Sequence, residues 1–377
     1  MKDKLKKNEI CFHGGTSFDA VGISFDKLNK KEKVIRADVT DAWFDTSPKV
    51  INLVNKNLPW LLKNSPPTLA DGLIKAISTN RKIPEENILV GGGSSDLMFI
   101  FFPNFDFKRA VIIDPMYGES AHIIKNVLGK KIKRVFQNKE NNFKVDIESV
   151  VKEVLNGDLV IIVNPNNPTG QFVRRTQMDE LLKKLPKKVT LFIDETYIDF
   201  IGKEESVESL AIKNKNLVVL KSMSKFFALS GARIGYLIAH EEVTKKLRNK
   251  IPPWSVGLIG QVAGVKAMED ESFFIEKNNE TSNLRKEFLE NLTKIEGIKV
   301  FPSVTNFLLI DISHTGRKAK EICSFLEKRS IFIRNPQSQS VQFKEDFIRI
   351  SVKDRKTNNK ICNALKEAIL AKEELIK

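Results

Sequence analysis

The sequence is poor in cysteine and histidine. Its 377 residues include three cysteines, Cys11, Cys323 and Cys362, and four histidines, all scattered along the chain. An odd, scattered set of cysteines argues against a disulfide framework, and neither residue type shows the spacing of metal ligands. We therefore expect no metal, and the few cysteines suit a reducing compartment such as the cytoplasm.

The chain also lacks a long hydrophobic run. No stretch reaches the roughly 18 apolar residues that a membrane span requires, so no membrane partner is expected. Residues 1–7 are mostly charged and contain no apolar core of a secretory signal. These absences favour a cytoplasmic location.

Basic residues exceed acidic ones, and the net charge is +15. Nucleic-acid binders usually gather such charge in a stripe with interleaved aromatic residues. Here lysines alternate with acidic residues along the whole length, so we expect no nucleic-acid partner. The excess of positive charge is compatible with a small anionic substrate.

The length allows two compact domains, and two kinds of pattern divide the chain. Short apolar segments alternate with helical patterns up to about Pro252, which predicts an α/β domain with a mostly parallel sheet. A long helix is expected over 260–292, and the last third has an α+β pattern that ends in a helix. The expected strands are 88–90, 111–113, 160–163, 191–193, 217–220, 236–238, 306–310, 331–334 and 347–351, and a further helix is expected over 318–328.

Lys225 lies in a segment that suits a phosphorylated cofactor. It follows Ser222 and Ser224, and Arg233 comes eight residues later. Hydroxyl groups on a turn can donate hydrogen bonds to a phosphate. A lysine that forms a Schiff base needs desolvation or a nearby cation to lower its pKa. Alone, a Ser-x-Ser-Lys motif more often marks solvated surface residues.

Two other expected strands end in polar groups. Strand 160–163 leads into residues 164–170, Asn-Pro-Asn-Asn-Pro-Thr-Gly, and strand 191–193 leads into Asp194. Open α/β sheets place ligands at such strand ends. Taken singly, Asp194 could cap a helix and Tyr197 could be a core aromatic residue. Three such strand ends in one chain are hard to assign to packing alone.

A glycine turn, Gly91-Gly92-Gly93, follows another expected strand and precedes Ser94 and Ser95. Glycines let a phosphate approach closely, and a helix N-terminus exposes backbone N–H groups to it. The turn is neither a P-loop nor a GxGxxG motif, so it gives little support to nucleotide binding. By itself it could be an ordinary strand-to-helix turn.

Together these segments resemble the fold-type I pyridoxal-phosphate (PLP) enzymes of the class I and II aminotransferase family. The resemblance runs from about Val34 to the C-terminus and is strongest to the branch of histidinol-phosphate aminotransferase and threonine-phosphate decarboxylase of cobalamin synthesis. It implies PLP as cofactor and an α/β, fold-type I architecture: a large domain with a mostly parallel seven-stranded sheet and a smaller α+β domain. The expected domains are an N-terminal arm over 1–42, which is part of the small domain, a large PLP-binding domain over 43–257 and a C-terminal small domain over 258–377.

The resemblance also assigns roles to residues. Lys225 would form the Schiff base, and Asp194 would keep the pyridine nitrogen protonated. Asn167 and Tyr197 would hydrogen-bond the phenolic oxygen of the ring, and Tyr117 would stack on the ring. Lys225, Asp194, Tyr197 and Tyr117 are thus the expected catalytic residues. The expected phosphate cup consists of Gly93, Ser94, Ser95, Ser222, Ser224 and Arg233.

Two arginines match substrate-binding positions of the family. Arg349 would grip the substrate α-carboxylate, and Arg334 would bind a substrate phosphate, although either could be an ordinary strand-edge arginine. The expected substrate-binding residues are His13, Gly14, Asn167, Trp254, Asn306, Arg334 and Arg349.

One position departs from the family pattern. Relatives carry a Tyr-Pro pair that reaches the cofactor phosphate of the neighbouring subunit, whereas Ser65 stands in the place of that tyrosine here. A homodimer is still expected, with this contact weakened or reorganised.

The reaction is the least determined part of the prediction. The segments 13–15 (His-Gly-Gly) and 253–256 (Pro-Trp-Ser-Val), together with Tyr117-x-Glu119, resemble the decarboxylase. We therefore expect decarboxylation of a small anionic substrate, O-phosphoserine or O-phosphothreonine, to an amino-alcohol phosphate such as ethanolamine phosphate. The alternative is a glutamate-dependent aminotransferase for a small phosphorylated substrate. A third possibility is a basic binding protein without catalysis.

Overall fold

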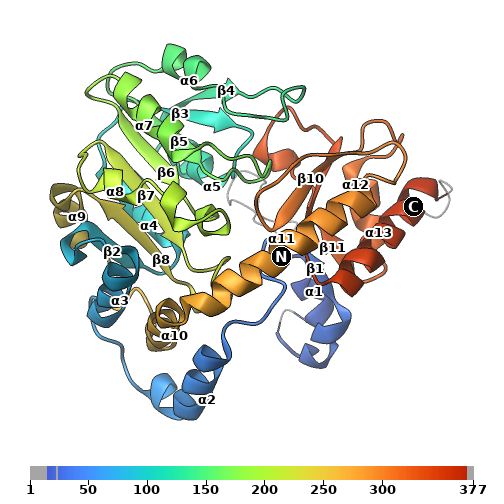
Figure 1. The fold of residues 1–377 in the computed structure, drawn as a ribbon, viewed down its shortest axis with the longest axis horizontal. Helices are drawn as coiled ribbons and strands as arrows, with labels where there is room; N and C mark the ends of the chain where they lie inside the picture. The colour runs from blue at the N-terminus through green and yellow to red at the C-terminus, as the bar shows by residue number, and fades with distance from the viewer. Residues whose placement is uncertain (1–14, 23, 372–377) are drawn as a thin grey trace. The chain divides into compact units, whose positions relative to one another are not determined.

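The computed structural model describes residues 15–22 and 24–371, which form two compact units (Figure 1). Unit 1 comprises 44–167 and 171–278, and unit 2 comprises 15–43, 168–170 and 279–371. Each unit has its own sheets and its own apolar core. Within the described ranges, none of the helices has the length and apolar character that crossing a membrane demands.

A seven-stranded sheet forms the centre of unit 1, with strand order β2-β8-β7-β6-β5-β3-β4. Only β8 runs against the others, since it pairs antiparallel with β2 and β7 while the remaining pairs are parallel. The α/β, fold-type I expectation with a mostly parallel sheet is confirmed. The strands are β2 (Ile88–Gly91), β3 (Arg109–Asp114), β4 (Lys131–Phe136), β5 (Leu159–Val163), β6 (Thr190–Asp194), β7 (Leu217–Ser222) and β8 (Gly235–Ala239).

The central strands are apolar because both faces of the sheet are covered. Every residue of β5, β6 and β7 is buried, as expected for parallel strands between helices. Leu220 on β7 joins the core that contains Leu97 of α4 (Ser94–Phe101). The next residue, Lys221, points to the other face, where it contacts Glu208 of α8 (Glu208–Ala211). The two faces of β7 therefore have different surroundings, one apolar and one charged.

All six strands expected in this part of the chain are present, but β4 was not anticipated. Its sequence, Lys-Ile-Lys-Arg-Val-Phe, mixes basic and apolar residues. Because β4 lies at the edge of the sheet, it pairs on one side only, and basic side chains are common on such edges. The expected apolar-run signal is therefore missing from this strand.

The long helix expected over 260–292 is two helices, α10 (Leu258–Glu269) and α11 (Glu271–Leu292). The interruption is at Asp270, whose carboxylate accepts hydrogen bonds from the Ser47 hydroxyl and the Lys49 ammonium. Since α10 packs against α2 and α3, residues 258–278 lie in unit 1 rather than with the C-terminal segment. The other helices of unit 1 are α2 (Pro48–Lys63), α3 (Asp71–Arg81), α5 (Glu119–His122), α6 (Ile147–Glu153), α7 (Arg175–Lys184) and α9 (Glu241–Arg248).

Unit 2 has the expected α+β character. Its three-stranded sheet has the order β12-β10-β9 with antiparallel pairs, and β1 pairs parallel with β11. Alternate residues of β10 and β12 join a core with α12 and α13, where Ile361 and Leu365 lie one turn apart. The elements are α1 (Phe18–Val21), β1 (Ile35–Ala37), β9 (Lys299–Val300), β10 (Phe307–Asp311), α12 (Ala319–Glu327), β11 (Ile331–Ile333), β12 (Phe347–Ser351) and α13 (Arg355–Leu370).

Candidate active site

Three polar strand ends lie side by side at one edge of the unit 1 sheet. Asp194, the last residue of β6, is in register with Val163 on β5 and with Leu220 on β7. The antiparallel β8 begins at the same edge, where Gly235 pairs with Ser222 and with Gly91. Four features therefore emerge at this edge: the glycine turn 91–93, the asparagine-rich loop 164–170, Asp194, and the serine-lysine turn 222–225.

The glycine turn packs tightly against Arg233. Gly93 has φ +103°, and a Cβ atom added there would lie 2.5 Å from an Arg233 guanidinium nitrogen. A Cβ atom added at Gly235 would lie 2.6 Å from the Gly93 carbonyl carbon. Glycine is thus required at both positions. The result is a guanidinium beside the exposed N–H groups at the start of α4, which is a combination that favours a phosphate.

The side chains of Asp96 and Ser255 hold the glycine turn in place through hydrogen bonds. The Gly92 N–H lies 2.8 Å from Oδ2 of Asp96 and 3.0 Å from Oγ of Ser255. The Ser255 hydroxyl in turn donates to the same Asp96 oxygen at 2.6 Å. Sequence reasoning singled out the motif around Ser255 but gave neither residue this role. An acidic residue in the first helical turn was the available signal for Asp96.

The Ser95 hydroxyl points to a buried carboxylate. It donates to Oε2 of Glu119 at 2.8 Å, and Glu119 is only 4% exposed. The hydroxyl proton is therefore committed to Glu119. The predicted contact of Ser95 with the cofactor would therefore use its backbone N–H. This group lies in the first turn of α4, where N–H groups lack intrahelical partners.

The turn after β7 is ordered by its own serines. The Ser224 N–H donates to the Ser222 hydroxyl at 3.2 Å, and the Ser230 hydroxyl donates to the Ser224 carbonyl at 2.9 Å. Ser222 and Ser224 are buried, whereas Lys225 is half-buried. This turn presents Lys225 at the same edge of the sheet as Asp194.

Asp194 is a buried carboxylate with a perturbed pKa. It is 5% exposed, and its Oδ1 accepts hydrogen bonds from the Thr196 N–H at 2.9 Å and the Thr196 hydroxyl at 2.6 Å. Burial raises the pKa of Asp194 to about 6, although the Thr196 hydrogen bonds oppose this rise. A cationic partner such as a protonated ring nitrogen would stabilise the ionised form.

The asparagines after β5 have distinct roles. Asn164 exchanges two hydrogen bonds of 2.8 Å with the backbone of Val173, so it closes the loop. Asn166 donates to the Pro115 carbonyl at 2.8 Å, which ties this loop to the segment that carries the half-buried Tyr117. These two asparagines therefore serve the loop itself.

Asn167 pairs with Tyr197 instead. Its amide donates to the Tyr197 hydroxyl at 3.3 Å, and both side chains are buried. Tyr197 also stacks on Phe200 with ring centroids 6.3 Å apart. The two residues expected to share one oxygen of the cofactor thus contact each other.

Two expected substrate residues face each other in unit 2. Arg334 and Arg349 form an antiparallel bridge, with backbone hydrogen bonds of 3.0 and 2.9 Å in the two directions. Arg349 is 4% exposed and donates to the Asp38 carbonyl at 2.7 Å, whereas Arg334 is half-buried. Directly opposed residues of such a bridge project from the same face. The unit therefore brings two guanidinium groups to one face.

The other expected substrate residues have different surroundings. Asn306 in unit 2 is buried and donates to the Thr40 carbonyl at 2.9 Å. Trp254 in unit 1 is 55% exposed and has φ +62°, an uncommon value for a bulky residue. His13 and Gly14 lie outside the described residues. Substrate roles for these four residues remain predictions.

Residues 54–365 match the sequence profile of class I and II aminotransferases. The chain belongs to this family. It is 26% identical over 344 residues to histidinol-phosphate aminotransferase from Methanococcus aeolicus, covering 90% of this chain and 91% of that one. A relative from Methanocaldococcus jannaschii is 28% identical over 327 residues, with 86% of each chain covered.

Solved structures of the family agree with this membership. The histidinol-phosphate aminotransferase from Clostridium acetobutylicum superposes with a TM-score of 0.81 at 26% identity, covering 89% of this chain and 99% of that one. A counterpart from Sinorhizobium meliloti, solved in complex with PLP, has a TM-score of 0.78 at 20% identity, covering 96% and 98% of the two chains. The expected branch of the family and its PLP cofactor are confirmed, and the chain is a PLP-dependent family enzyme.

The expected decarboxylation is wrong. The curated relatives named above are aminotransferases at 26% and 28% identity over most of the chain. The threonine-phosphate decarboxylase from Porphyromonas gingivalis has a TM-score of 0.78 at 23% identity, which shows the common fold alone. One of the three motifs behind that expectation, 253–256, includes Ser255, which hydrogen-bonds the Gly92 N–H and the Asp96 carboxylate.

The residues at this edge suit PLP. The Gly93–Arg233 cradle matches a phosphate, and the buried Asp194 carboxylate matches a protonated ring nitrogen. The half-buried Lys225 is placed to bond an aldehyde, and the Asn167–Tyr197 pair offers donors to a phenolic oxygen. The individual roles remain predictions, and two substitutions test them.

Lys225→Ala should remove the visible absorption band of lysine-bound PLP while the far-ultraviolet circular dichroism stays unchanged, because the half-buried side chain is not part of either apolar core. In the unsubstituted protein, borohydride reduction and peptide mapping should place the label on Lys225. A label on another lysine, or a band that survives in Lys225→Ala, would contradict the assignment.

Asp194→Asn should stabilise the cofactor-free protein at pH 7.5. The pKa of Asp194 in the folded protein, about 6, is above its ordinary value of 3.8, so the unfolded chain loses this proton first as the pH rises. The free energy of unfolding should therefore fall between about pH 4 and pH 6, and the variant should avoid up to about 3 kcal/mol of that loss. Urea unfolding of both proteins across this range measures the difference, and parallel curves would refute it.

Proposed function

We propose that the protein is an aminotransferase for a small phosphorylated substrate, with glutamate as the amino donor. The observation that carries this proposal is the similarity to histidinol-phosphate aminotransferase across 90% of the chain. These relatives are named aminotransferases, not decarboxylases. The candidate site supports the same class of reaction, because it suits PLP.

The arginine pair of unit 2 supports an anionic substrate. Guanidinium groups form charge-assisted hydrogen bonds with carboxylate and phosphate groups, and two of them project from one face here. Arg349 is proposed to bind the substrate α-carboxylate, since its planar guanidinium suits bidentate contact. Arg334, on the same face, is proposed to bind the substrate phosphate.

Residues of unit 1 would bind the cofactor and transfer the proton. Bound PLP supplies an electron sink that allows a proton to leave the substrate carbon that carries the amino group. Lys225 is proposed to take this proton on its amine as a general base and to deliver it to the cofactor instead of returning it to the same carbon. Asp194 would keep the ring nitrogen protonated, and Asn167 with Tyr197 would orient the ring. Tyr117 would cover one face of it.

Incubation with histidinol phosphate and 2-oxoglutarate tests the proposal. Glutamate should form in step with the loss of histidinol phosphate, and Lys225→Ala should abolish both. O-phosphothreonine and O-phosphoserine serve as comparison substrates, since release of CO₂ and an amino-alcohol phosphate would contradict the transfer reaction. Failure with all phosphorylated donors, while aspartate or an aromatic amino acid reacts, would overturn the substrate class.

Substitution of the arginines should separate two substrate contacts. Arg349→Lys retains the charge but loses the planar fork, so kcat/KM should fall about 100-fold for every amino donor. Arg334→Gln should raise KM about ten-fold for the phosphorylated donor only, leaving glutamate nearly unaffected. Lys320→Gln, an equal loss of charge at an exposed position of α12, is the control. A uniform effect of Arg334→Gln on both donors would refute its assignment to phosphate.

We also propose a homodimer. The helix α2 exposes Leu58, Trp60 and Leu62 by 37%, 58% and 69%, and these residues do not share one face of the helix. A helix that is apolar on several sides is normally covered. Ser65, at the family position of an intersubunit contact, follows α2 and is exposed in the single chain. A second copy of the chain is the proposed cover.

Leu62→Glu should convert the dimer to monomer in sedimentation velocity at micromolar concentration, because a charge would be buried at the interface. Leu370→Glu changes an equally exposed leucine on α13 and should leave the dimer intact. A monomeric parent protein, or a dimer that survives Leu62→Glu, would reject α2 as the interface.

A further inference from the structure

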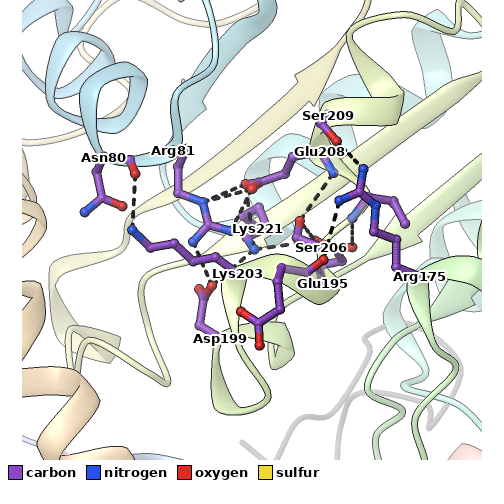
Figure 2. Close-up of polar contacts among 12 residues, drawn as sticks. Asn80, Arg81, Arg175, Glu195, Asp199, Lys203, Ser206, Glu208, Ser209 and Lys221 are labelled. Carbon is purple, nitrogen blue, oxygen red and sulfur yellow. Dashed lines mark hydrogen bonds and ion pairs between the residues drawn. The ribbon is translucent and has the colours of Figure 1, made fainter.

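Five buried charged residues form a cluster in unit 1 (Figure 2), and one of them, Glu195, directly follows Asp194 of the candidate site. The buried charge cluster consists of Arg81, Glu195, Asp199, Glu208 and Lys221, and each side chain is at most 8% exposed. Three carboxylates face two cations, so one negative charge is in excess when all are ionised. Nothing in the proposed reaction uses these residues, yet burying so many charges is costly.

Lys221 is the centre of the buried charge cluster. Its ammonium lies 3.4 Å from Glu195, 3.5 Å from Asp199 and 3.7 Å from Glu208. The contacts with Glu195 and Asp199 are hydrogen bonds, and the contact with Glu208 is an ion pair. Burial raises the pKa of Asp199, but Lys221 and Arg81 outweigh it and hold that pKa below its ordinary value. Lys221 therefore stabilises charged groups that cannot reach water.

Arg81 closes the cluster from the end of α3. Its guanidinium binds Glu208 through Nε at 2.9 Å and Nη2 at 2.6 Å, and it donates to Asp199 at 2.9 Å. Glu195 accepts hydrogen bonds from the Ser206 hydroxyl at 2.5 Å and the Val207 N–H at 2.9 Å. Each carboxylate thus has a second partner besides Lys221. These partners hold the carboxylate oxygens in place around the Lys221 ammonium.

The contacts of Lys221 lie next to two predicted cofactor residues. Glu195 directly follows Asp194, and Asp199 comes two residues after Tyr197, so Lys221 binds the segment 194–199 at Glu195 and at Asp199. The Glu195 N–H also donates to the Leu220 carbonyl at 2.8 Å, one residue before Lys221. The ammonium therefore joins β7 to the short segment that carries Asp194 and Tyr197.

The serine-lysine turn begins at the end of β7, directly after Lys221. Lys221 is followed at once by Ser222, whose hydroxyl accepts from the Ser224 N–H ahead of Lys225. Side chains alternate along a strand, so Lys221 points away from the face to which Ser222 points. Lys221 can thus influence the site through the chain segments it holds and through its charge, which lowers the pKa of Asp194 against the larger effect of burial.

We propose that Lys221 is a positioning residue for PLP, whose ammonium locks the segment 194–199 to the end of β7 so that Asp194, Tyr197 and Lys225 keep their mutual geometry. This inference rests on the PLP cofactor of the family and on the predicted roles of these three residues, not on the identity of the substrate. It assigns a cofactor-dependent function to a cluster that would otherwise serve stability alone.

The test compares the PLP dissociation constant of cofactor-free variants with their thermal stability. Lys221→Met should raise this constant at least about ten-fold, as loss of supporting contacts does at metal sites, and it should weaken the visible band at saturating PLP. Lys221→Arg restores the charge and donors and should recover PLP affinity to within about three-fold. If Lys221→Met does not fold, Lys221→Gln, which keeps N–H donors, is measured by the same criterion.

Two controls separate positioning from stability. Val218→Ala removes buried methyl groups from the same strand, on the apolar face, and should lower the melting temperature without changing PLP affinity by more than about two-fold. Tyr236→Phe removes a buried hydroxyl, opposite Lys221 in register, that has no hydrogen-bond partner among the described atoms, and should change neither quantity.

Unchanged PLP affinity in the Lys221 variants, or an equal loss of affinity in Val218→Ala at matched melting temperature, would overturn the proposal. Because PLP binding is measured directly, this result is independent of which substrate the enzyme accepts. Absence of aminotransferase activity in the parent protein would reject the proposed function and leave this inference standing.

Discussion

The parallel register of β5, β6 and β7 is the constraint on which the candidate site depends. It places Val163, Asp194 and Leu220 side by side, so the segments that follow them emerge at one edge of the sheet. A slip of one residue would turn Asp194 to the opposite face and exchange the apolar and charged surroundings of β7. Complete burial of these strands makes such a slip very unfavourable, since charges would enter an apolar core.

Buried carboxylates at this edge of the sheet determine which charged groups the site can bind. Among the described residues, the buried Asp194 carboxylate accepts hydrogen bonds from Thr196 alone, and burial raises its pKa. The neighbouring carboxylates of Glu195 and Asp199 are matched by Lys221 and Arg81. Lys221 and Arg81 hold the pKa of Asp199 below its ordinary value, whereas burial outweighs Lys221 at Glu195 and raises the pKa of that carboxyl.

The sequence was sufficient for features that depend on local patterns. Apolar runs ending in polar loops predicted β5, β6 and β7, and together with the family resemblance they predicted the residues at the cofactor edge. The edge strand β4 was missed because basic residues interrupt its apolar pattern, and the break at Asp270 depends on Ser47 and Lys49, more than 200 residues away.

Long-range pairing limited the rest of the prediction. Arg81 and Glu208 are 127 residues apart in the chain, so nothing local indicated the buried charge cluster. The reaction was wrongly predicted from three short motifs, and in one of them Ser255 contacts the glycine turn rather than a group that selects a reaction. Residues that hold a cofactor are easier to identify from a sequence than residues that select its reaction.

A crystal structure of the PLP-loaded protein tests the central claim most directly. We expect continuous density from Lys225 to the cofactor, an Asp194 carboxylate oxygen within hydrogen-bond distance of the ring nitrogen, and the phosphate against Gly93 and Arg233. PLP bound through a different lysine, or a ring nitrogen that faces away from Asp194, would contradict it.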